Sequence, residues 1–141
     1  MSTNSLRLDG LEELRAQLRA LPSELTAEAS RIVDATANAA AVEVRTEYGR
    51  HNVSGSLQAG VVVTHVEGGK WSAGAILKSM AKHAWLFENG SQARHTDLGA
   101  DRGSMPPAHV FVPAVMRARR SMYQKLKDML VRNGLTVTGE P

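Results

Sequence analysis

The sequence contains no cysteine, so it can form no disulfide and no metal site built on thiolates. Long hydrophobic runs are missing as well, because no stretch approaches the roughly 18 apolar residues that a membrane-spanning helix requires. Residues 1–8 include no hydrophobic segment of the kind that directs secretion. These absences predict a protein that is made and used in a cytoplasm, with no membrane partner.

Aromatic residues are few, with two each of tryptophan, tyrosine and phenylalanine. Proteins that bind single-stranded nucleic acid commonly stack bases on aromatic side chains, so this composition argues against that mode of binding. The length of 141 residues is that of one ordinary domain with its own core. We predict a single domain over residues 1–141, with flexible tails at 1–8 and 135–141.

Motifs for catalysis and metal binding are also missing. None of the five histidines is four residues from another, and no cluster of carboxylates accompanies a pair of them. The sequence has neither a G-x-S-x-G nucleophile turn nor a G-x-x-x-x-G-K-[ST] phosphate loop. Glu88 near His83, and His95 near Asp97, are interpreted as chance neighbours. We expect no catalytic residue, metal or cofactor, and a hydrolase or nuclease with a composite site has no supporting pattern.

The net charge of +3 is unevenly distributed. Residues 113–134 carry six cations and one acid, which is +5 and leaves −2 for the remainder. The cations are Arg117, Arg119, Arg120, Lys125, Lys127 and Arg132. A basic helix of this kind can follow phosphates, but cations toward a helix C-terminus are also favourable on an ordinary solvated face. Both interpretations stay open.

Two helices are predicted in the first 50 residues. Asp9 and Glu12 have the spacing of a capping box, and the leucine stripe that follows predicts a short amphipathic helix interrupted by Pro22. The stripe consists of Leu11, Leu14, Leu18 and Leu21. Ser23 is the expected cap of a second helix of about 25 residues, ending near Tyr48. Its predicted apolar face contains Leu25, Ala29, Ile32, Val33, Ala37, Ala40 and Val44.

A change of period predicts a β-hairpin in the middle of the chain. The segment Leu57–Glu67 is typical of a strand, and Gly68-Gly69 offers a tight reversal. A second strand is expected from Trp71, with Trp71, Ala73, Ala75 and Leu77 on one face. The run 82–88 is short enough to form either a third strand or a single helical turn.

The stretch 90–107 points most directly to function. It is polar, rich in Gly, Ser, Arg and His, and has no periodic apolar positions. A loop of that length in a compact domain is usually functional or disordered. Hydrophobic residues lie on both sides of it, namely Trp85, Leu86 and Phe87 before it and Val110, Phe111 and Val112 after it. Core packing explains much of that apolar character, and the loop held between them is interpreted as a device that grips a neighbouring copy.

A C-terminal helix is predicted to complete the domain. Pro113 suits its first turn, and Asn133-Gly134 suits its C-terminal stop. The expected buried stripe is Val115, Met116, Met122, Tyr123, Leu126, Met129 and Leu130. The predicted fold class is therefore α+β, with two N-terminal helices, a small antiparallel β-sheet with a hairpin, a long loop and a C-terminal helix.

Five short blocks occur in an order that resembles the tail-component (gene-ten-like) family of neck and tail-completion proteins of long-tailed bacteriophages. The blocks are Leu11–Pro22 with the alanine-rich helix, Val53-Ser-Gly-Ser-Leu57 (family V-x-T-G-x-L), the hairpin, Ala84-Trp-Leu-Phe-Glu-Asn-Gly90 (Y-x-x-F-x-E-x-G-T) and Pro107-Ala-His-Val-Phe-Val-Pro113 (P-A-x-P-F-x-x-P-A). The resemblance covers nearly the whole chain. Ser54, Ser56 and His109 differ from the residues common in the family and leave the subfamily open.

The resemblance implies a structural component of the virion at the head–tail junction. Such a protein forms a ring through which DNA passes and joins the tail to the head. The implied partners are other copies in a homo-oligomeric ring (hexamer or dodecamer), the neighbouring head-completion (connector) and tail proteins, and, transiently, genomic DNA in the lumen. Assembly in the host cytoplasm is implied too. By position, Val53, Gly55 and Leu57 match the turn, Phe87, Glu88 and Gly90 the aromatic–acidic–glycine block, and Pro107, Phe111 and Pro113 the entry into the last helix.

We therefore expect a non-enzymatic virion component. The alternatives are a small basic nucleic-acid-binding protein that uses the last helix, and a tail terminator or minor tail protein. Arg117, Arg119 and Arg120 are expected at subunit or partner interfaces and not along a bore, because a strongly basic bore would retain the genome. The predicted interface residues are Trp85, Phe87, Glu88, Arg94, His95, Arg102, Met105, Pro107, His109, Phe111, Arg117, Arg119 and Arg120.

Overall fold

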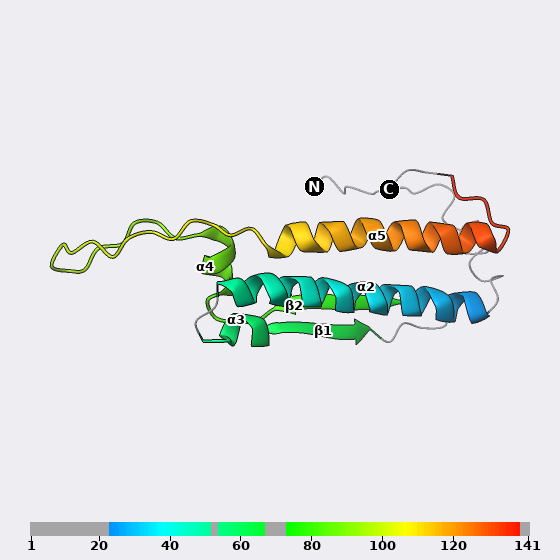
Figure 1. The fold of residues 1–141 in the computed structure, drawn as a ribbon, viewed down its shortest axis with the longest axis horizontal. Helices are drawn as coiled ribbons and strands as arrows, with labels where there is room; N and C mark the ends of the chain where they lie inside the picture. Colours follow the sequence, from blue (N-terminus) through cyan, green and yellow to red (C-terminus); the bar gives the residue numbers. More distant parts are fainter. Residues whose placement is uncertain (1–22, 52–53, 67–72, 139–141) are drawn as a thin grey trace, which may run out of the picture.

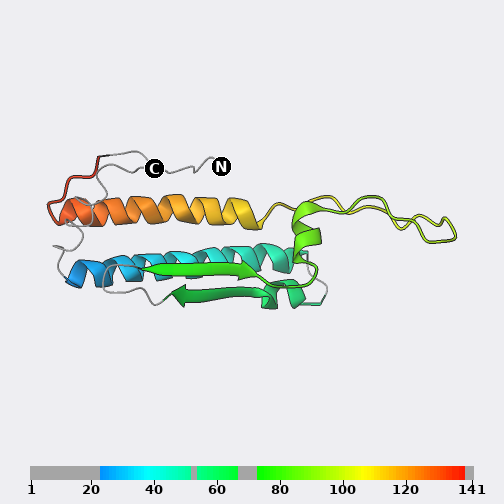
Figure 2. The same cartoon turned by 180° about the vertical axis from the view of Figure 1, so that it is seen from behind.

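The computed structural model describes residues 23–51, 54–66 and 73–138. Its elements are, in chain order, α2 (Ser23–Arg50), α3 (Ser56–Ala59), β1 (Val61–Val66), β2 (Gly74–Ser79), α4 (Ala84–Asn89) and α5 (Phe111–Arg132). The long helix α2 packs against α5 on one side and against the two strands on another, and a narrow loop projects from one end of this body (Figure 1 and Figure 2). The predicted α+β class is confirmed.

Helix α2 is the central element, because α5 and the two-stranded sheet both pack their apolar sides against it. It begins at the expected Ser23 and extends over 28 residues. Its buried residues are Leu25, Thr36, Ala40, Ala41, Val44 and Tyr48. Small side chains in its middle allow α5 and the sheet to approach closely. Of the predicted apolar face, Leu25, Ala40 and Val44 are buried, and the other members are half-buried.

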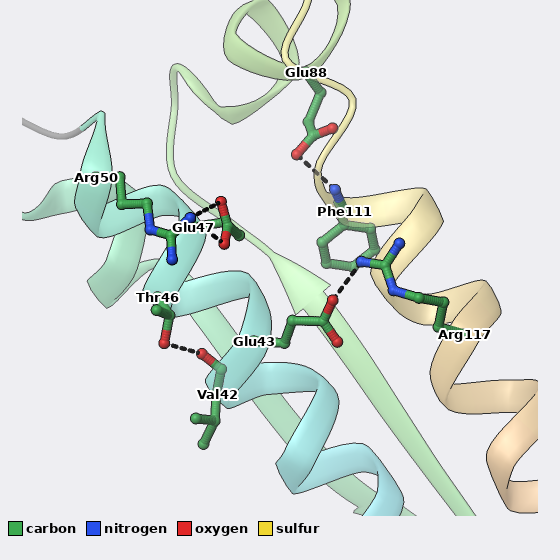
Figure 3. A network of polar contacts seen from close by, with 8 residues as sticks. All are labelled: Val42, Glu43, Thr46, Glu47, Arg50, Glu88, Phe111 and Arg117. Atoms are coloured by element: carbon green, nitrogen blue, oxygen red, sulfur yellow. Dashed lines mark hydrogen bonds and ion pairs between the residues drawn. The ribbon is translucent and has the colours of Figure 1, made fainter.

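Two ion pairs define how α2 and α5 lie together. Arg132 Nη2 lies 2.7 Å from Glu28 Oε1, and Arg117 pairs with Glu43; Figure 3 shows the second pair. Residues 28 and 43 on α2 are 15 positions apart, as are residues 117 and 132 on α5, and the partners are in opposite order. The helices are therefore antiparallel and in register over roughly 22 Å, at 1.5 Å per residue.

The hairpin forms as predicted, with one correction at its start. β1 and β2 are antiparallel, with Val61 opposite Ser79 and Val66 opposite Gly74. Residues 57–59, predicted to begin the strand, instead belong to the single helical turn α3. That turn places Leu57 in the core, where it is 7% exposed. A short apolar run is compatible with either a strand or a buried helical turn. Here the residues form a helical turn, which packs against α2.

Several other expectations are settled by the structure. The run 82–88 forms the short helix α4 and not a third strand. Met116 and Tyr123, predicted to be buried, are exposed. The reason is that, among the described elements, α5 packs mainly against α2, and the residues that it buries fully are Ala114 and Met129. The expected helix at 11–21, the Gly68-Gly69 turn, Trp71 and the 1–8 tail lie outside the described residues.

The C-terminal stop of α5 is confirmed at Asn133-Gly134. Gly134 has φ 79°. Its N–H donates to the Val131 carbonyl (3.0 Å), and the Leu135 N–H donates to the Leu130 carbonyl (3.0 Å). This pair of bonds defines a Schellman motif, which satisfies carbonyls left unpaired at a helix end. Leu135, assigned to a flexible tail by the sequence, is therefore bonded to the helix.

Candidate functional site

The most distinctive surface feature is the loop of residues 90–107, which we call the arm. It consists of two antiparallel segments that project from the body (Figure 1). The Ser91 N–H donates to the Met105 carbonyl (2.8 Å), the Arg94 N–H to the Gly103 carbonyl (3.1 Å) and the Arg102 N–H to the Arg94 carbonyl (2.7 Å). The arm is thus an incomplete two-stranded ribbon and not a structureless loop.

The base of the arm has two unusual backbone conformations. Gly90 has φ 77°, and a Cβ atom there would lie 2.6 Å from the Met105 carbonyl oxygen. Glycine is therefore required where the outgoing segment passes the returning one. On the returning side, His109 has φ 48°. A proline ring fixes φ near −65°, so proline could not occupy this position with this backbone.

Glu88 fastens the arm to the body. Its carboxylate accepts hydrogen bonds from the Val110 N–H (2.8 Å), the Phe111 N–H (2.9 Å) and the Tyr48 hydroxyl (2.8 Å); Figure 3 shows the bond to Phe111. These N–H groups belong to the N-cap residue Val110 and to Phe111, the first residue of α5, and N–H groups at this end of a helix lack partners within it. A carboxylate at this end also interacts favourably with the helix dipole. Glu88 is thus a cap for α5 supplied by a different helix.

Tyr48 completes this connection from the central helix. Its side chain is fully buried, and its hydroxyl lies 3.3 Å from Ser79 Oγ in addition to its bond to Glu88. Burial, which disfavours the phenolate, is the main reason that the pKa of Tyr48 is raised to about 12; the bond to Ser79 opposes the shift and Glu88 adds to it. The group is therefore a neutral donor, and it joins α2, β2 and α4 at one point.

Two hydrophobic residues of α4, both predicted at an interface, lie in different environments. Phe87 packs on the core, with its ring centroid 5.3 Å from that of Tyr48 in an edge-to-face arrangement. Trp85 is 69% exposed. Trp85 therefore remains available for contact with another molecule, whereas Phe87 has a structural role, as has Phe111 at the start of α5.

Beside Trp85 lies an apolar groove of about 680 Å³. One wall is the end of β2 and the residue after it, including Lys78 and Met80, and the other is the start of α5, including Val112. Tyr48 and Ala84 also line it. Met80 is 68% exposed and Val112 is 66% exposed, so several large apolar side chains face solvent together. Such a cluster marks a surface suited to interaction.

The remaining predicted residues of the arm lie along its length. Arg94, His95 and Arg102 form a polar hollow with Thr96 and Asp97 in the outer half. Met105 and Pro107 are near the base, where they line a second hollow with Trp85. The tip is formed by Asp97, Leu98, Gly99, Ala100 and Asp101, and the Thr96 N–H donates to the Ala100 carbonyl (2.9 Å).

The three arginines predicted on α5 have separate surroundings. Arg117 pairs with Glu43 of the same chain. Arg119 donates to the Tyr123 hydroxyl (3.1 Å) and lies over the Tyr123 ring. Arg120 has no ion-pair partner within the part of the chain that the structure describes, and the same holds for Lys125 and Lys127. Two of the three predicted interface arginines thus have contacts within their own chain.

Three residues of this region were not predicted from the sequence to have a role in it. Tyr48 was assigned only as the end of a helix, Met80 had no role, and Leu98 was an unremarkable loop residue. The interaction of Tyr48 with Glu88 joins positions 40 residues apart, so no local pattern could indicate it. Leu98 had a detectable signal, because it is a lone large hydrophobic residue among polar and small ones.

Among residues 23–51, 54–66 and 73–138, no group of three or more His, Cys, Asp or Glu side chains is placed to hold a metal ion. No helix in the described part of the chain is long and apolar enough to cross a membrane. No family model matches the chain, and comparisons with curated proteins and with solved structures gave no match.

Proposed function

We propose that this chain is a structural component of the head–tail junction of a long-tailed bacteriophage, where copies form a ring that joins tail to head. The observation that carries the proposal is the arm, which projects from a small body beside an exposed apolar groove. A ring requires two different, complementary surfaces on each copy, so that contacts run head to tail and close by rotation. The arm and the groove are two such surfaces, and the order of the sequence blocks supports the phage assignment.

The experiment is negative-stain electron microscopy of the purified full-length chain over a range of concentrations, alone and with isolated heads or tails. Closed rings with a central hole, or added density at the junction, are the expected result. A chain shortened in the arm is the matched control and is expected to give no rings. Particles that stay monomeric in every mixture would overturn the proposal.

One observation favours a second function, namely binding of duplex nucleic acid by α5. Arg120, Lys125 and Lys127 are exposed on this helix without an acidic partner among the described residues. Cations of this kind bind phosphates with an affinity that falls steeply as salt increases. A mobility-shift titration at two salt concentrations tests this. Tight duplex binding at physiological salt that is lost on changing these three residues to alanine would favour this function over the ring.

A further inference from the structure

The sheet has an open edge that faces the groove. β1 and β2 form a two-stranded sheet in the described part of the chain, so the far side of β2 pairs with no other described strand. The Met80 N–H donates to the Gly60 carbonyl (2.8 Å). The residues of this ladder that form backbone hydrogen bonds with the opposite strand are therefore the even-numbered ones. In an antiparallel ladder the alternate residues direct their N–H and C=O groups outward. On β2 these residues are Ala75, Leu77 and Ser79.

The opposite edge of the sheet supports this assignment. The same alternation directs the Val61 carbonyl outward from β1, and Arg45 Nη2 donates a hydrogen bond to it (2.8 Å). The β1 edge is thus partly occupied by a side chain of α2. The β2 edge has Leu77 and Ser79 in the wall of the groove, opposite the start of α5. A strand edge beside an apolar groove is the arrangement that binds an extended segment by β-strand addition.

The tip of the arm has the properties that such a groove requires. Leu98 is 97% exposed, so its side chain makes almost no contact in its own copy. The tip holds Asp97 and Asp101 on either side of it, and neither forms an ion pair among the described residues. Near the groove, Lys78 and Lys82 are exposed and have no acidic partner in the described chain. The groove itself contains Lys78 and also Glu88, whose carboxylate is occupied by Tyr48, Val110 and Phe111. The acidic, apolar tip therefore complements the apolar groove and the exposed Lys78.

The arm also needs a partner for its own stability. A two-stranded ribbon alone is at best marginally stable in water. This ribbon has only two bridges, Ser91 with Met105 and His95 with Asp101. Each side has about eight residues, which at about 3.3 Å per residue extends the tip more than 20 Å from the base. At that distance the tip lies beyond its own body and within reach of an adjacent one.

We infer that the tip of the arm, residues 97–101 of one copy, binds the groove between the β2 edge and α5 of a second copy. The tip is a turn, closed by the bond from the Gly99 N–H to the Thr96 carbonyl (2.8 Å). Leu98 on this turn enters the apolar groove beside Met80 and Trp85, and Asp97 and Asp101 approach Lys78 and Lys82. The backbone of an arm segment that flanks the turn pairs with the outward groups of β2. The inference rests on the proposed function only in that both require self-association. It adds which surfaces meet and which residues make the contact.

The chain has no cysteine, so single cysteines report this contact without a background. A ¹⁵N-labelled Leu98→Cys chain is mixed with an unlabelled Met80→Cys chain, oxidised mildly, and analysed by intact mass. Because each chain carries one cysteine, a mixed disulfide can form only between two copies. The matched control replaces Met80→Cys by Val42→Cys, an exposed position (58%) on α2 away from the groove.

We expect the Leu98/Met80 disulfide to form at least tenfold faster than the Leu98/Val42 disulfide. Leu98→Asp, introduced at a side chain with almost no intramolecular contact, should leave the circular dichroism unchanged and abolish self-association in sedimentation velocity. Equal rates for the two cysteine pairs, or no mixed disulfide at the highest soluble concentration, would overturn the inference. If rings form but the Leu98/Met80 disulfide does not, the inference about the tip and groove is overturned and the proposed ring function stands. If no rings form in any mixture, the proposed function is overturned.

Discussion

At the scale of single residues, Glu88 makes the connection on which the geometry of the arm depends. Its carboxylate holds the first N–H groups of α5 and the Tyr48 hydroxyl, although the three partners are 22 to 40 residues away. The resemblance marked this acidic residue, and the interpretation placed it at an interface with another molecule. The structure assigns it a role inside the chain.

Replacing Glu88 by alanine leaves two backbone N–H groups and a buried hydroxyl without their acceptor. We expect the free energy of unfolding to fall by about 3 kcal/mol, in the range for loss of a buried hydrogen-bonded group. Glu88→Gln keeps one acceptor oxygen and should lose about half as much. Urea denaturation measures both, with Glu47→Ala as control, because its exposed pair with Arg50 is worth less than about 1 kcal/mol. Equal stability of Glu88→Ala and the control would contradict the capping role.

Tyr48 predicts a specific loss of stability at high pH. Its pKa is raised to about 12 in the folded chain, whereas an unfolded tyrosine titrates near pH 10. The folded state therefore retains the proton more tightly, and this contribution is complete below about pH 10 and is lost as the pH rises toward 12. Tyr48→Phe should show a shallower decline in the free energy of unfolding between pH 9.5 and 11.5. Tyr123→Phe retains Tyr48 and should decline as steeply as the wild type.

At the scale of the elements, α5 packs against α2 within the described part of the chain, and its two ends are fixed in different ways. Glu88 of α4 caps its start, and the Schellman motif at Gly134 closes its end. The motif at the C-terminal end is formed by neighbouring residues, so the Asn133-Gly134 pair was enough to predict where the helix stops. The start depends on a distant carboxylate, which explains why the sequence identified the helix without identifying its cap.

Gly134→Ala should destabilise the chain by about 1 kcal/mol, because a side chain at φ 79° is strained and the two closing hydrogen bonds would weaken. Thermal unfolding followed by circular dichroism measures the effect, with Thr136→Ala, at an exposed position beyond the motif, as a neutral control. An unchanged midpoint would show that the last turn of α5 contributes nothing to stability.

Element types were predictable wherever the pattern was long. Helices α2 and α5 and the hairpin followed from periodic apolar positions, and the class followed from them. Short segments were not predictable in the same way: residues 57–59 and 84–89 became helical turns because Leu57 and Ala84 reach the core in that conformation. Met116 and Tyr123 were assigned to the core because they belong to the apolar stripe of α5, and the sequence does not indicate how much of that stripe the neighbouring helix covers.

At the scale of the whole molecule, the body and the arm are separable. The core cluster contains residues of α2, α3, β1, α4 and α5 and no residue of the arm. The sequence marked residues 90–107 as functional from their length and polarity. It did not reveal the groove, since the groove walls come from β2 and α5 and meet only in the fold. The arm is one continuous segment and can be recognised in the sequence, whereas the groove is formed by distant segments and cannot.

Replacing residues 92–104 by Asn-Gly should leave the body folded, because Ser91 and Met105 already form a bridge that a two-residue turn can close. We expect the helical circular dichroism of the body to be preserved, a midpoint within a few degrees of the full chain, and no self-association by sedimentation. Loss of the cooperative transition would show instead that the arm contributes to folding.

The attachment of the arm also has a mechanical consequence. One segment of the arm begins just after Glu88, and the other leads to Val110, whose N–H donates to the Glu88 carboxylate. The arm extends roughly along the axes of α2 and α5 (Figure 1). Tension on the tip would therefore act lengthwise on α5 and load its contact with α2 in shear. In shear the two ion pairs and the packed stripe between them bear the load together, whereas in peeling they would fail one after another. The body is thus oriented to resist a pull through its arm, which is the load that the proposed joint would have to bear.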